Sequence, residues 1–110
     1  MTARPRPHYN LDVWKCSMEL AKVVYARTKG FPPDERFGMT VQMRRCAVSV
    51  PSNIAEGACR GSRKDFLHFL MIARGSLGEL ETQCSLASAL GYMHEEESVY
   101  VLTDKVFQML

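Results

Sequence analysis

The sequence has no apolar run approaching the roughly 20 residues that a membrane-spanning helix needs. Its first ten residues, MTARPRPHYN, are polar and interrupted by proline, so they lack the apolar core of a signal peptide. We therefore expect no membrane association and a cytoplasmic location. Residues 1–9 are expected to form a flexible polar leader, and residues 10–110 a single domain.

Metal-ligand spacings are also missing. The four cysteines form no C-x-x-C pair, and no histidine stands in a ligand pattern such as H-E-x-x-H. We therefore predict reduced cysteines, no zinc and no cofactor. The residues concerned are Cys16, Cys46, Cys59, Cys84, His8, His68 and His94.

Catalytic motifs are absent as well. The stretch GACRGSRK, residues 57–64, approaches a phosphate-binding loop, but its glycines are one residue too close and no strand is expected before it. No serine stands in a nucleophile elbow, and no pair of acids is spaced for acid–base catalysis. The sequence predicts a protein that is not an enzyme.

What the chain does contain is typical of a soluble helical domain. It has 110 residues, 46% hydrophobic and 24% charged, which suits one core and neither disorder nor a membrane protein. Seven methionines favour helices, because strands prefer β-branched and aromatic residues.

Charge is distributed unevenly although the net charge is only +2. Residues 1–30 and 36–74 are basic, whereas residues 75–110 hold six acids against Lys105 alone. This asymmetry suits either a basic face that binds polyanions or oppositely charged helices lying side by side.

Apolar residues at helical spacing predict four helices. The first is expected over about 11–29, capped by Asn10 and ended by Gly30 in a left-handed conformation. Its apolar residues recur at Leu11, Trp14, Met18, Ala21 and Tyr25.

The second helix is expected over about 37–57, with a kink at Pro51. It has two neighbouring apolar stripes, which contain Phe37, Val41, Arg44, Val48 and Ala55 in one and Met43, Ala47, Val50 and Ile54 in the other.

The third helix is the most regular segment. Ser62 and Asp65 resemble a capping box at its start, and Gly91 with Tyr92 predicts a Schellman-type stop. Between them runs a heptad seam of Phe66, Leu70, Ala73, Leu77, Leu80, Cys84 and Ala87. A final helix is expected to begin at Glu95, Glu96 and Glu97.

Four helices joined by short turns predict an all-α fold, an antiparallel up-down four-helix bundle. Gly75 and Gly78 lie inside the third helix, where each costs about 1 kcal/mol relative to alanine. Close approach of another helix would offset that cost. Together with the length of the third helix, this predicts a homo-oligomer.

Basic residues are the remaining candidates for function. Arg60, Arg63 and Lys64 cluster where the third helix begins, and a helix N-terminus attracts anions, although these residues alone fit a solvated turn slightly better. Arg44, Arg45 and Arg74 are expected to form structural or interfacial ion pairs. The carboxylates available to them are Glu56, Glu79 and Glu81.

Three strings carry a resemblance to a known family. Residues 10–14 are NLDVW, residues 42–57 are QMRRCAVSVPSNIAEG, and residues 72–83 are IARGSLGELETQ. Over residues 10–110 the chain resembles the four-helix bundle proteins encoded in bacterial 23S rRNA intervening sequences, and it is also similar to the accessory variability determinant of diversity-generating retroelements.

The resemblance implies a bacterial cytoplasmic homopentamer around a central channel. It further implies binding of RNA or DNA, and of a protein partner such as a reverse transcriptase, through a basic surface. No catalytic residues are known for the family. The positions that match its motifs are Arg44, Arg45, Asn53, Glu56, Arg74, Ser76, Glu79, Glu81 and Gln83.

Two hypotheses follow from these observations. The first is an oligomeric accessory protein that binds nucleic acid, with Arg60, Arg63, Lys64, Arg44 and Arg45 as its contacts. The second is a structural or protein-interaction scaffold that binds no nucleic acid, in which the basic residues serve subunit contacts.

Overall fold

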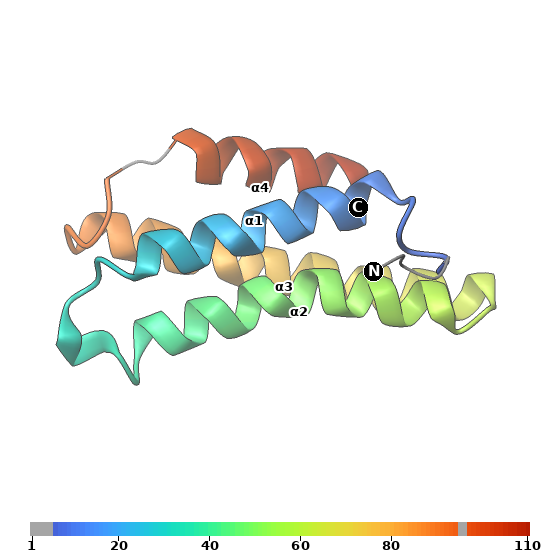
Figure 1. Ribbon diagram of the computed structural model, residues 1–110, viewed down its shortest axis with the longest axis horizontal. Helices are drawn as coiled ribbons and strands as arrows, with labels where there is room; N and C mark the ends of the chain where they lie inside the picture. The colour runs from blue at the N-terminus through green and yellow to red at the C-terminus, as the bar shows by residue number, and fades with distance from the viewer. Residues whose placement is uncertain (1–5, 95–96) are drawn as a thin grey trace, which may run out of the picture.

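The computed structural model describes residues 6–94 and 97–110, and every regular element in these ranges is helical (Figure 1). The all-α, four-helix prediction is confirmed. The elements are α1 (Asp12–Thr28), a short 3-10 helix (Pro33–Glu35), α2 (Met39–Cys59), α3 (Arg63–Ala89) and α4 (Glu97–Met109).

The helices lie side by side along a body of 43 × 32 × 25 Å. The longest helices, α2 and α3, form the most extensive pairing, whereas α1 packs against both α2 and α4. Contact between α3 and α4 is the smallest of the helix pairings. The core lies between these helices and consists mainly of aliphatic side chains.

The start of α1 differs from the prediction. Asn10 does not cap the helix, because the N-cap residue is Leu11 and no side chain caps it. A preceding turn, in which the Leu11 amide donates to the His8 carbonyl at 3.0 Å, holds Asn10 one residue too early. The Leu11 carbonyl then accepts from the amides of Trp14 and Lys15.

The end of α1 also differs. Gly30 does not adopt a positive φ, which among the described residues occurs only at Gly61 and Gly91. The helix instead tightens, with the Gly30 amide donating to Arg27 and the Phe31 amide to Thr28. Pro32 follows at once and prevents continuation, so no left-handed residue is needed.

The predicted apolar stripe of α1 is not the most deeply buried one, although Leu11, Trp14 and Ala21 pack against the core. The buried residues are Ser17, Leu20, Val24 and Thr28. Trp14, Met18 and Ala21 are only half-buried, and Tyr25 is exposed. The polar members of the true core stripe are satisfied within the helix, since Ser17 Oγ donates to the Trp14 carbonyl and Thr28 Oγ1 to the Val24 carbonyl, both at 2.8 Å.

In α2 the second of the two predicted stripes forms the core: Met43, Ala47, Val50 and Ile54 are all buried. The other stripe turns outward, with Val48 42% exposed and Phe37, which precedes the helix, 86% exposed. Pro51 lies inside a single continuous helix, as predicted.

Both ends of α3 follow the sequence closely. Ser62 Oγ accepts from the Asp65 amide at 3.1 Å, which caps the N-terminus. At the other end Gly91 has φ +77°, and the Tyr92 amide donates to the Ala87 carbonyl at 2.9 Å while the Gly91 amide donates to Ser88. These two bonds are the Schellman motif. Between the ends the seam residues Ala73, Leu77, Leu80, Cys84 and Ala87 are buried.

The last helix runs over Glu97–Met109 and buries Val99, Thr103 and Val106. The prediction that it begins at Glu95 and Glu96 concerns residues outside the described ranges. In the described part, the Thr103 hydroxyl donates to the Val99 carbonyl at 2.8 Å, so this buried polar group is satisfied without a partner from another helix.

The α2–α3 pairing is closest at Gly57. A Cβ atom built there would lie 2.7 Å from Phe69 Cβ, 3.2 Å from the Phe66 carbonyl oxygen and 3.3 Å from Phe66 Cα. Two of these three atoms belong to the backbone of α3, so they cannot move aside without shifting the helix. At Gly75 and Gly78 no atom lies within 4 Å of such a Cβ. The close helix expected there is not among the described residues of this chain.

These contacts predict opposite effects for two identical changes. Gly57→Ala should lower the free energy of unfolding by about 1–3 kcal/mol, because it overpacks the contact with α3. Gly78→Ala should raise it by up to about 1 kcal/mol, because alanine favours a helix and meets no neighbour. Urea unfolding followed by circular dichroism measures both, and a neutral Gly57→Ala would contradict the packing described here.

Candidate functional site

The predicted basic cluster lies in the turn that joins α2 to α3. Arg60, Arg63 and Lys64 are all exposed, and Gly61, with φ +85°, reverses the chain between them. Figure 1 shows this turn at one end of the bundle, away from the turn that joins α3 to α4. The structure therefore brings together three of the five residues predicted to contact nucleic acid.

Arg60 is held in place by two contacts. Its Nη2 donates to Glu56 Oε2 at 2.8 Å, and its guanidinium lies 4.9 Å from the centre of the Phe69 ring. The Glu56 hydrogen bond is the main reason that the pKa of Arg60 is raised. Both partners of this ion pair remain about half exposed, so the pair contributes little stability and can exchange for another anion.

The N-terminus of α3 adds two backbone donors to the cluster, the amides of Arg63 and Lys64. Ser62 accepts from the amides of Asp65 and Phe66, through its side chain and its carbonyl. The amides of Arg63 and Lys64 donate to no group in the described part of the chain, as is usual in a first helical turn. Two cationic side chains thus stand on the positive end of a 27-residue helix.

Arg44 and Arg45 lie elsewhere. They are about 15 residues before Arg60 on α2, which corresponds to about 22 Å along a helix. Arg44 joins α2 to α1: its Nε donates to Thr28 Oγ1 at 2.8 Å, its Nη2 to the Tyr25 carbonyl at 3.3 Å, and its guanidinium stacks 4.6 Å from the Tyr25 ring centre. Its partners are therefore neutral, and the predicted carboxylate pair is wrong. Arg45 is exposed.

Five of the motif positions line one edge of the α2–α3 pair. Ser49 and Ser76 meet across it, with their hydroxyl oxygens 2.8 Å apart, and Asn53 Nδ2 donates to both the carbonyl and the hydroxyl of Ser49. This edge is a row of polar contacts beside the apolar core. The motif residues on it are Asn53, Glu56, Ser76, Glu79 and Gln83.

Burial affects two side chains on this edge, Gln83 and Cys46. The Gln83 Oε1 atom is buried and has no hydrogen-bond partner among the described residues. Burial raises the pKa of the neighbouring Cys46 thiol, and the Glu79 carboxylate raises it further. Cys46 is therefore a neutral thiol at physiological pH.

Arg74 and Glu81 lie on a different side of α3 from this edge. Arg74 is exposed and forms no ion pair in residues 6–94 and 97–110, so the predicted pairing with Glu56, Glu79 or Glu81 is wrong within this chain. Glu56 pairs instead with Arg60.

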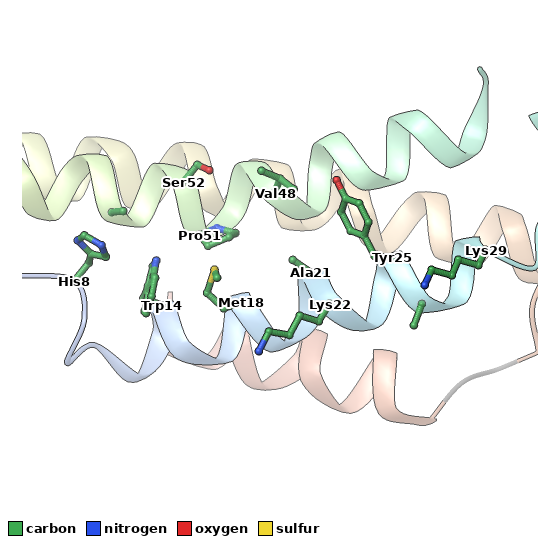
Figure 2. Close-up of a pocket in the computed structure, with 12 residues that line it drawn as sticks. His8, Trp14, Met18, Ala21, Lys22, Tyr25, Lys29, Val48, Pro51 and Ser52 are labelled. Atoms are coloured by element: carbon green, nitrogen blue, oxygen red, sulfur yellow. The ribbon is translucent and has the colours of Figure 1, made fainter. Parts of the chain in front are cut away.

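One large hollow was not foreseen from the sequence. It is an apolar groove of about 650 Å³ between α1 and α2 (Figure 2). Its walls are the outward stripes of the two helices, and Lys22 and Lys29 stand at its margin. We call it the α1–α2 groove; its main lining residues are Trp14, Met18, Ala21, Tyr25, Val48, Pro51, Ser52 and Ala55.

The cysteines are free thiols, and within the part of the chain that the structure describes no three metal-ligating side chains gather. Cys84 is buried in the core, which raises its pKa to about 11. None of the helices described is both long and apolar enough to span a bilayer.

A sequence profile of the 23S rRNA-intervening sequence protein family matches residues 9–110. No curated protein matches the chain.

Mutations of the two neighbouring arginines of α2 should have different effects on the free energy of unfolding. Arg44→Met keeps the aliphatic stem but removes the donors to Thr28 and Tyr25, so the free energy of unfolding should fall by about 1–2 kcal/mol. Arg45→Met should change it by less than about 0.5 kcal/mol, because Arg45 is exposed. Thermal or urea unfolding measures both. Equal effects at the two positions would refute a structural role for Arg44.

Proposed function

The chain belongs to the 23S rRNA-intervening sequence protein family, and on that premise we propose that it is a non-enzymatic, oligomeric helical-bundle protein that binds nucleic acid through the basic turn between α2 and α3. The observation that carries this proposal is the exposed cluster of Arg60, Arg63 and Lys64 at the N-terminus of α3.

Phosphate is the group that best fits this cluster. The first amides of α3 point along the helix axis, and the helix dipole favours an anion in front of them. Arginine donates to phosphate oxygens in a bidentate geometry, and a lysine adds a mobile charge. Arg60 can contribute by exchanging Glu56 for a phosphate, because their ion pair is solvated.

The cluster contacts a nucleic acid backbone and carries no means of reading bases. Its side chains are cationic, and the ring of Phe69 beside it is covered by Arg60. Recognition by shape and phosphate spacing suits this surface, with affinity governed by counterion release. Arg45 lies too far along α2 to share one phosphate with the turn, and Arg44 is occupied by α1.

A homo-oligomer is the second part of the proposal. It is supported by aliphatic side chains left exposed on α2 and α3, including Val48 at 42%, Ile72 at 40% and Leu86 at 49%. The resemblance to the family implies that the oligomer is a pentamer. Repetition of the basic turn around a ring would combine several weak phosphate contacts into one stronger, multivalent interaction.

A protein-interaction scaffold that binds no nucleic acid is the alternative, and a reverse transcriptase as protein partner remains a prediction from the resemblance, as does a cytoplasmic location. The scaffold alternative is favoured by the Arg60–Glu56 pair, which already neutralises one of the three cations.

Binding to a structured RNA should weaken steeply with salt. Each neutralised phosphate contributes about −0.9 on duplex, or about −0.7 on single strands, to the slope of log K against log salt concentration. The triple variant Arg60→Glu, Arg63→Glu, Lys64→Glu should abolish binding at about 50 mM salt. Fluorescence anisotropy with labelled RNA and DNA of the same sequence measures both the slope and the nucleic acid preference.

A matched control carries the same change of charge elsewhere. Lys15→Glu, Arg36→Glu, Lys105→Glu reverses three exposed cations outside the turn and should reduce affinity only modestly. Equal losses in the two triple variants would show that net charge, rather than the basic turn, is responsible. Absence of binding by the wild-type protein even at low salt would leave the scaffold.

A further inference from the structure

The α1–α2 groove has the character of an interface rather than of a solvated surface. Pro51 is buried at its floor, and Trp14, Met18 and Ala21 line one wall and keep part of their surface exposed. Tyr25 and Val48 are each 42% exposed at its margin. Two helices that each present a second apolar stripe to the outside leave a contiguous apolar surface to be covered.

Charge around the groove has one sign. The charged side chains that line it are Lys22 and Lys29, and the adjoining smaller hollow adds Arg44 and Arg45. No described Asp or Glu lines either hollow. Lys22 does pair with Glu19, but on the outer surface of α1, where both side chains are more than half exposed. An occupant with apolar side chains and carboxylates would therefore be complementary.

The same chain carries such a surface on an exposed side of α3, next to the α2–α3 edge to which Glu79 also belongs. Residues at helical spacing form an exposed row that we call the α3 stripe: Ile72, Gly75, Glu79, Thr82, Leu86 and Leu90. Ile72 is 40%, Leu86 49% and Leu90 50% exposed. The stripe carries a carboxylate at Glu79 and no cation, and it lies in the acidic C-terminal third of the chain.

Gly75 makes the α3 stripe suited to close packing. A Cβ there would meet no atom of this chain within 4 Å, so nothing in the described molecule explains a glycine in mid-helix. A glycine costs about 1 kcal/mol at such a position. Close approach of a helix from another molecule would offset the cost, since the missing side chain lets two helix surfaces come nearer together.

The lengths of the two surfaces agree. The α3 stripe extends over 72–90, about 27 Å at 1.5 Å per residue, and the α1 wall of the groove extends over 14–29, about 22 Å. A helix laid in a groove between two helices is a recurrent mode of recognition. The length, the apolar pattern and the charge of the stripe all match the groove.

We propose that the α1–α2 groove of one copy of this chain receives the α3 stripe of the next copy. The inference rests on the oligomer proposed above and identifies the two surfaces that would build it. Because the groove and the stripe are different parts of one molecule, the contact is head-to-tail, and repetition closes into a ring when the rotation between copies allows it. Glu79 then faces the lysines of the groove.

A head-to-tail contact has a distinctive test. Val48→Glu disables the groove by placing a carboxylate against Glu79, and Leu86→Arg disables the stripe by placing a cation against the lysines. Each variant alone should be a monomer by native mass spectrometry and light scattering. An equimolar mixture should associate again into particles of at least two chains, because one variant keeps its stripe and the other keeps its groove.

Matched controls use exposed residues of the same type. Val101→Glu lies on α4, and Leu67→Arg changes a leucine of α3 that is exposed to the same 49% as Leu86 but lies on another side of the helix. Both controls should assemble like the wild-type protein. Circular dichroism checks that all variants keep their helices. Ser52→Glu in the groove and Ile72→Arg on the stripe repeat the two changes at other exposed positions.

The outcomes separate this inference from the proposed function. A wild-type protein that is monomeric at about 100 µM, well above a micromolar dissociation constant, overturns the oligomer and the interface together. A wild-type oligomer that persists in Val48→Glu or Leu86→Arg overturns only the interface. Monomeric variants that stay monomeric when mixed overturn the head-to-tail pairing.

Discussion

The close pairing of α2 with α3 is the contact on which the rest of the structure depends. Gly57 lets the backbone of α3 pass beside α2, and beyond it the buried seam of α3 packs on Ala47, Val50 and Ile54. The Ser49–Ser76 hydrogen bond joins the same two helices along their edge, and Asn53 donates to the Ser49 hydroxyl from within α2. Because these contacts set the angle at which α3 leaves the turn, they also set where the basic turn lies.

The other helices are added to this pair with progressively less contact. Arg44 fastens α1 to α2 through neutral partners, Thr28 and Tyr25, which suits a half-buried site where a carboxylate would have to be desolvated. The last helix packs mainly on α1 and least on α3. A bundle built this way keeps much of the outer surface of α3 uncovered, which is where the exposed aliphatic residues Leu67, Met71, Leu86 and Leu90 are found.

The two proposed activities use different surfaces, so they can operate together. The basic turn lies at one end of the bundle, whereas the α1–α2 groove runs along α1 and α2, and the stripe spans residues 72–90 of α3. Charge is divided in the same way: the basic part of the chain supplies the turn and the groove, and the acidic part supplies the stripe. Both proposals therefore use the uneven charge of the sequence, one as a polyanion-binding face and the other as complementary helices in contact.

Local signals determined most of the fold. Ser62, Gly91 and the seam from Ala73 to Ala87 gave the limits and the buried face of α3, because a capping hydroxyl, a left-handed glycine and a heptad pattern act within a few residues. The tertiary structure alone decided which stripe of α1 faces inward. Ser17 and Thr28 enter the core because their hydroxyls bond to their own helix, while the more apolar Trp14 and Met18 face the groove. Residue types reveal that a helix has apolar sides, but packing against particular neighbours selects the side that is buried and so creates the surface left for a partner.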